Sequence, residues 1–92
     1  MSEPNKLDAI LEERGSRYGN FARQAMISQA FKAVLYAYRQ KGVLAADQAE
    51  ALDMIFNKIG RIINGDPNYA DSWVDIAGYA QLVADRLEDK TT

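Results

Sequence analysis

The strongest constraint in this chain is a pair of amphipathic segments, 47–64 and 71–88, joined by the short sequence GDPNY. In both segments apolar side chains recur at the three- and four-residue spacing of a helix, with polar side chains on another side. Gly65 suits the end of the first helix, and Pro67 prevents that helix from continuing. A connection this short predicts two antiparallel neighbouring helices.

Two further helices are predicted before this pair. Residues 5–14 favour a short helix that stops at Gly15, followed by the glycine-containing loop GSRYGN at 15–20. Residues 21–41 carry a helical apolar pattern that we expect to end at Gly42. The chain therefore predicts an all-α fold, an antiparallel helical bundle with a short N-terminal helix and three longer ones.

The length of 92 residues indicates one domain, and 1–4 and 89–92 are polar enough to be loose ends. Asp47, with Glu50 three residues later, is expected to cap the third helix, and Asp71 to cap the fourth. A core of this size is marginal, and the fourth helix has a broad apolar face. We therefore expect a homo-oligomer, a dimer or a tetramer.

Composition excludes several kinds of chemistry. The chain has no cysteine and no histidine, which removes thiolate catalysis and zinc sites built on those residues. Its net charge of −2 gives no electrostatic drive toward duplex nucleic acid. The N-terminus is too polar for a signal peptide, and no apolar run is long enough for a membrane span, so we expect a cytoplasmic protein without membrane contact.

Four carboxylates form the candidate metal site. Glu50 and Asp53 lie one helical turn apart, as do Asp71 and Asp75 on the next helix. Carboxylate oxygens on neighbouring helices suit Mg²⁺, which also bridges substrate phosphates. Asp53 and Asp75 are the candidate catalytic residues because neither lies at a helix end. The alternative is that these carboxylates cap helices and cover solvated faces.

A second group of side chains suits a phosphorylated ligand. Arginine and lysine bind phosphate through charge-assisted hydrogen bonds, and tyrosine stacks on a base. A solvated loop and an intrahelical polar network explain the same residues without a ligand. The candidate ligand-binding residues are Arg14, Arg17, Tyr18, Asn57, Lys58, Arg61 and Tyr79.

Most of the chain resembles a small uncharacterised family found largely in bacteriophages and prophages, which would place the protein in the host cytoplasm. The resemblance rests on RYG at 17–19, ALDMI at 51–55, NK at 57–58, GDP at 65–67 and DSWVDIAGYA at 71–80.

The segment DSWVDIAGYAQLV also looks like a helix of the MazG-like all-α nucleotide pyrophosphatases. Those enzymes hold Mg²⁺ with an E-x-x-E pair and an E-x-x-D pair and cleave nucleoside triphosphates to monophosphate and pyrophosphate. The resemblance implies that Glu50 and Asp53 stand for the first pair and Asp75 for the last carboxylate. Ser72 replaces a glutamate of that pattern, which leaves Asp71 one residue earlier as a substitute.

Three functional hypotheses follow. The first is a nucleotide-handling protein that acts as a Mg²⁺-dependent nucleoside triphosphate pyrophosphohydrolase. The second is a non-catalytic sponge that sequesters a nucleotide or cyclic nucleotide used as an immune signal, an anti-defence role. The third is an inhibitor that docks on a host protein through the apolar side of the fourth helix.

Overall fold

The computed structural model describes residues 6–89, and its side chains are described except at 13–16. Within that range the chain forms four helices and no strand, which confirms the predicted all-α fold with a shorter first helix. The predicted loose ends 1–4 and 89–92 lie outside the described residues except for Asp89. The helices are α1 (Lys6–Tyr18), α2 (Phe21–Tyr38), α3 (Ala46–Asn64) and α4 (Ala70–Leu87).

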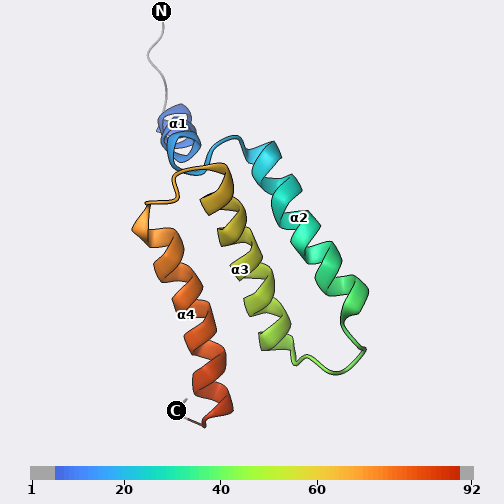
Figure 1. Ribbon diagram of the computed structural model, residues 1–92. Coiled ribbons are helices and arrows are strands. Elements are labelled where there is room, and N and C mark those ends of the chain that lie inside the picture. The colour runs from blue at the N-terminus through green and yellow to red at the C-terminus, as the bar shows by residue number, and fades with distance from the viewer. Residues whose placement is uncertain (1–5, 90–92) are drawn as a thin grey trace, which may run out of the picture.

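The three long helices lie side by side in an open layer with α3 in the middle (Figure 1). α2 and α4 pack against opposite sides of α3 and run antiparallel to it, while α1 lies at one end against α2 and α3. In the described part of the chain α2 and α4 do not contact each other. This helical bundle therefore keeps two broad faces that no helix of the same chain covers.

Two predicted helix ends are wrong. α1 continues through Gly15 to Tyr18, because one glycine inside a helix costs only about 1 kcal/mol. The helix stops before Gly19, whose positive φ of 76° gives the left-handed backbone that ends helices. α2 ends at Tyr38, earlier than predicted, and Gly42 (φ 80°) lies in the turn that follows.

The predicted capping residues of α3 and α4 are also wrong. α3 begins after Ala45, whose backbone N–H donates a 2.8 Å hydrogen bond to the side chain of Gln48. α4 begins after Tyr69, so Asp71 lies inside its first turn. Asp47 lies in the first turn of α3 and pairs with α4 instead. Both aspartates still favour the helix dipole from these positions.

The described chain buries very little apolar surface. Ala51 is its one buried apolar side chain, while fifteen large apolar side chains are exposed. The contact between α2 and α3 includes the stacked rings of Phe31 and Phe56, 5.6 Å apart. Gly60 brings these helices close, since an added Cβ would lie 3.1 Å from the carbonyl oxygen of Gln24. No helix between residues 6 and 89 has the length and apolarity to cross a bilayer.

Candidate functional site

The α1–α2 turn and the α3–α4 turn are packed against each other at one end of the layer. The side-chain amide of Asn64 donates hydrogen bonds to the carbonyl oxygens of Tyr18 (3.0 Å) and Asn20 (2.7 Å). The backbone N–H of Asp66 donates to the carbonyl oxygen of Arg17 at 2.6 Å. These bonds satisfy backbone groups that the helix ends would otherwise leave unpaired.

Two glycines make this close packing possible. A Cβ at Gly19 would overlap the carbonyl oxygen of Asn64, and a Cβ at Gly65 would overlap that of Arg17. The motifs RYGN and NGDPNY, which are far apart in the sequence, therefore form one structural unit. Asn20 completes it by accepting the N–H of Arg23 at 3.1 Å, which caps α2.

Arginine and tyrosine side chains from both turns and from α3 form a stack, here called the Arg–Tyr cluster. The guanidinium of Arg17 lies 4.3 Å from the ring centre of Tyr69, and that of Arg61 lies 4.5 Å from the ring centre of Tyr18. The two rings meet edge to face at 6.1 Å. A guanidinium that stacks through its face keeps N–H groups at its edge for an acceptor.

A hollow of about 510 Å³ opens beside the Arg–Tyr cluster. Its walls combine apolar, aromatic, amide and cationic groups, the mixture typical of small-molecule sites. Arg61 contributes a guanidinium whose Nε is buried and has no hydrogen-bond partner among the described residues. The lining residues are Leu11, Tyr18, Gly19, Asn20, Phe21, Gln24 and Arg61.

The structure brings several of the predicted ligand-binding residues together. Arg17, Tyr18 and Arg61 all belong to the Arg–Tyr cluster. Asn57 adjoins the hollow indirectly, because its side-chain oxygen accepts a 2.9 Å hydrogen bond from Gln24 on the wall. The side of α3 that carries Asp53, Asn57 and Arg61 thus faces α2 and α1, whereas a metal site shared with Asp71 and Asp75 required it to face α4.

The other predicted ligand-binding residues lie elsewhere. Lys58 is buried on the α4 side of α3 and forms a 3.0 Å ion pair with Asp75. Tyr79 lines a separate hollow on α4 together with Asp75. The side chain of Arg14 lies outside the described residues.

Three of the four predicted metal ligands, Asp53, Asp71 and Asp75, each have a different partner. Asp53 accepts a 3.4 Å hydrogen bond from the hydroxyl of Tyr36, and Asp71 accepts one of 2.9 Å from the hydroxyl of Tyr69. The bond to Asp71 raises the pKa of the Tyr69 phenol above its usual value. Glu50 is exposed near the N-terminal end of α3.

The predicted metal site has no group of converging carboxylates to support it among the described side chains. Within residues 6–12 and 17–89, no three acidic side chains form a group that could hold a metal ion. Asp75 is neutralised by Lys58, and a nearby ammonium group opposes cation binding. Mg²⁺ binding and catalysis by Asp53 and Asp75 stay predictions from the sequence.

Several residues of the site were not predicted as ligand-binding, among them Phe21, Gln24 and Tyr69. A usable signal was present for Gln24, which precedes Ser28 by one helical turn on a helix of otherwise apolar pattern. Both side chains are buried where α2 meets α3 at Gly60. The role of Tyr69 in the cluster depends on contacts with Arg17 and Tyr18 that its position in the sequence does not reveal.

The fold and the cluster define a small all-α protein with a cationic, aromatic hollow at the junction of two turns. The chain belongs to the family of a domain of unknown function, DUF6378, whose family model matches residues 5–87. That range includes all four helices and both turns. Neither a curated protein nor a solved structure matches the chain.

Proposed function

We propose that this protein binds a phosphorylated nucleotide in the hollow beside the Arg–Tyr cluster. The observation that carries the proposal is the position of Arg61, which stacks on Tyr18 at the wall of an aromatic and apolar hollow. A nucleotide combines an anionic group with a flat apolar base, and this hollow offers partners for both.

The phosphate would contact the edges of the guanidinium groups. Arg61 forms no ion pair within residues 6–89, and the ring of Tyr18 holds its plane in place. A guanidinium fixed in this way loses little side-chain freedom when it binds phosphate. Arg17, stacked on Tyr69 in the same cluster, adds a second positive charge close by.

The base would contact the apolar and aromatic wall. Leu11, Tyr18 and Phe21 contribute this surface, and Asn20 and Gln24 supply amide groups that can recognise a base edge. The volume of about 510 Å³ is in the range of small-molecule sites. The exposed ring of Phe21 is available for stacking.

The arrangement of the carboxylates favours binding over hydrolysis. A pyrophosphohydrolase needs several carboxylates that converge on metal and phosphate, and those of the described residues are held apart by separate partners. We therefore propose sequestration of the nucleotide in the cytoplasm as the main function. A bacteriophage origin and a relationship to MazG-like enzymes remain hypotheses from the sequence, and sequestration is compatible with both.

The first experiment incubates the purified protein with a pool of nucleoside triphosphates and cyclic nucleotides, with and without Mg²⁺. The protein is then separated and denatured, and both fractions are analysed by mass spectrometry. An intact nucleotide released only from the denatured protein is the expected result. Monophosphate and pyrophosphate formed only with Mg²⁺ would favour the hydrolase instead. Recovery of no nucleotide would refute the proposal and favour the inhibitor hypothesis.

A matched pair of variants then tests the site. Arg61→Gln should weaken binding of the recovered nucleotide at least about tenfold, the effect of losing one charge-assisted hydrogen bond. Arg39→Gln is the control, because Arg39 also stacks on a tyrosine, Tyr36 at 4.9 Å, but does not line the hollow. Equal affinities of the two variants would show that the ligand binds elsewhere.

A further inference from the structure

The chain exposes more surface than a monomeric protein of its mass. Its accessible area is 7017 Å², whereas folded monomers of 10.3 kDa expose about 5,400 Å². The eight terminal residues outside the described range account for at most about 1,300 Å², the area of an extended chain of that mass. When those residues are left out of both the accessible area of the chain and the mass used for the expected area, an excess of about 700 Å² remains.

This excess matches what a protein interface removes from water. A standard interface buries about 800 Å² on each partner, and obligate homodimers bury more. The excess surface of one chain, between about 700 and 1,600 Å², therefore equals one side of a stable dimer interface.

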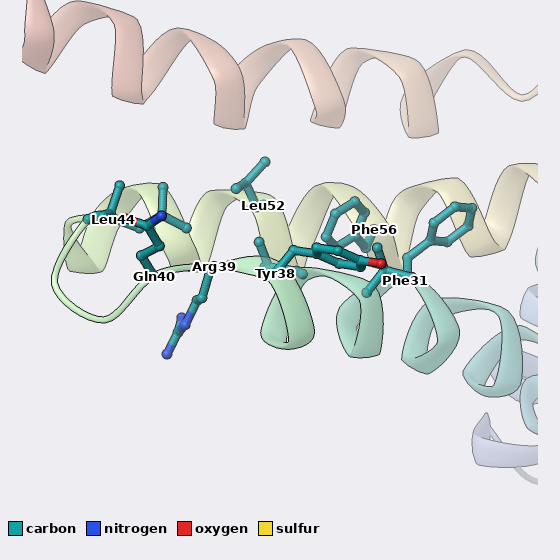
Figure 2. A pocket seen from close by; sticks show the side chains of 10 residues that line it. Phe31, Tyr38, Arg39, Gln40, Leu44, Leu52 and Phe56 are labelled. Atoms are coloured by element: carbon teal, nitrogen blue, oxygen red, sulfur yellow. The ribbon is translucent and has the colours of Figure 1, made fainter.

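An apolar part of that surface is a groove of about 860 Å³ between α2 and α3, here called the α2–α3 groove. Phe31 and Tyr38 from α2 and Leu52 and Phe56 from α3 line it, as Figure 2 shows. Arg39 is the one charged residue on its wall, and its side chain extends away from α3 (Figure 2). The complete lining is Phe31, Val34, Leu35, Tyr38, Arg39, Gln40, Val43, Leu44, Leu52 and Phe56.

The apolar surface continues from this groove toward α4. A second hollow shares Leu44 and Leu52 with it and reaches Ala80 and Val83 on α4. The two hollows together give a mainly apolar surface that runs from α2 across α3 to α4. The Arg–Tyr cluster lies at the opposite end of α3.

We infer that the α2–α3 groove is the contact surface of a homodimer, covered by the same groove of a second copy of this chain. Ala51 is the one buried apolar side chain of the described chain, and no large side chain there is fully buried, so one chain alone offsets little of the conformational entropy lost on folding. The missing core must be supplied by a partner present whenever the chain folds, and a second copy meets this condition. The wall offers almost no charge that would select a different, charged partner.

The shape of the surface also suits a two-fold contact. Such a contact requires one patch to contain both protruding and recessed groups, because the patch meets itself. Tyr38 (84% exposed) and Val34 (59% exposed) protrude, whereas Leu35 and Leu52 are recessed and half-buried. Protruding side chains of one copy can therefore enter the recess of the other.

The wild-type chain provides the first test. Light scattering after size exclusion should give the mass of two chains at micromolar concentration. The thermal unfolding midpoint should rise with protein concentration, because dissociation accompanies unfolding. A folded monomer whose thermal unfolding midpoint does not depend on protein concentration would overturn the inference. The partner that covers the groove would then be a different protein.

The second test locates the contact with a matched pair of variants. Val34→Glu places a charge in the α2–α3 groove, and Val74→Glu makes the same change on α4 at a valine of similar exposure, 64%. Val34→Glu should convert the dimer to a monomer or unfold it, whereas Val74→Glu should stay a folded dimer. In an isolated chain both exposed positions would tolerate glutamate, so unfolding of Val34→Glu alone also supports a covered face. A dimer that persists in Val34→Glu, or is lost in Val74→Glu, would refute this assignment.

Discussion

Replacement of Gly65 by alanine should separate the two turns that form the candidate site. The new Cβ would overlap the carbonyl oxygen of Arg17 and the backbone of Tyr18, so the backbone itself must move. Neither obstacle is the flexible end of a side chain that could turn aside. The movement would also break the hydrogen bond from the N–H of Asp66 to that carbonyl oxygen.

The loss of stability can be estimated from these two effects. Overpacking of this kind costs about 1–3 kcal/mol, and the broken hydrogen bond about 1 kcal/mol. The free energy of unfolding should therefore fall by about 2–4 kcal/mol, a large share of the 5–15 kcal/mol typical of a domain. With a urea slope of about 1 kcal/mol/M, the lower end of the usual range, the midpoint would fall by about 2–4 M.

The same substitution elsewhere in the chain provides the control. Gly78 lies inside α4, and a Cβ there would meet nothing within 4 Å. Gly78→Ala should therefore stabilise the protein by about 0.5–1 kcal/mol through helix propensity. Urea unfolding at one protein concentration, followed by circular dichroism, compares the two variants. Trp73 fluorescence reports on the turn directly, since the indole N–H donates to the carbonyl oxygen of Pro67 at 2.8 Å.

A single result would refute this reasoning about the junction. If Gly65→Ala unfolds at the same urea concentration as the wild type, the two turns do not pack as closely as described. Binding of the nucleotide should also weaken in Gly65→Ala, because Arg17 belongs to the Arg–Tyr cluster.

Two further predictions concern ion pairs. Asp75→Asn removes the partner of Lys58, whose side chain is 10% exposed, and should lower the free energy of unfolding by about 1–3 kcal/mol. Adding Lys58→Met to that variant should recover most of the loss in urea unfolding, and no recovery would argue against the ion pair. Hydrogen bonds from Arg86 lower the pKa of Asp47 below its usual 3.8. The pair therefore stabilises the fold fully above pH 3.8, and this stabilisation is lost as the pH falls through the lowered pKa of Asp47. Asp47→Asn should therefore flatten the dependence of the urea midpoint on pH below about pH 4, and an unchanged acid dependence would contradict the role of this pair.

The helical architecture could be predicted because apolar periodicity determines which segments form helices. The predicted start and end of the third helix lie within one residue of α3. The end of α1 could not be predicted, because Gly15 and Gly19 are equally plausible helix-ending glycines in the sequence. Only the packing against Asn64 decides that Gly19 takes the left-handed backbone.

The candidate site could be predicted only in part. Arg17, Tyr18 and Arg61 were identified as ligand-binding from their chemistry, but their convergence results from contacts between residues more than forty positions apart. A helical wheel separates the sides of α3 without saying which neighbour each side meets. The predicted metal site required Asp53 to face α4, but Asp53 accepts a hydrogen bond from Tyr36 on α2, and Asn57 on the same side bonds to Gln24 on α2.

The central position of α3 also bears on how this family can vary. Most turns of this helix have a neighbour on two sides at once, α2 on one and α4 on the other (Figure 1). A substitution there must be compatible with packing against both neighbours. The outer sides of α2 and α4 pack against no other helix of the same chain. Mutational tolerance should therefore be lowest along the middle helix and should increase outward, so that most neutral drift accumulates on the two flanking helices.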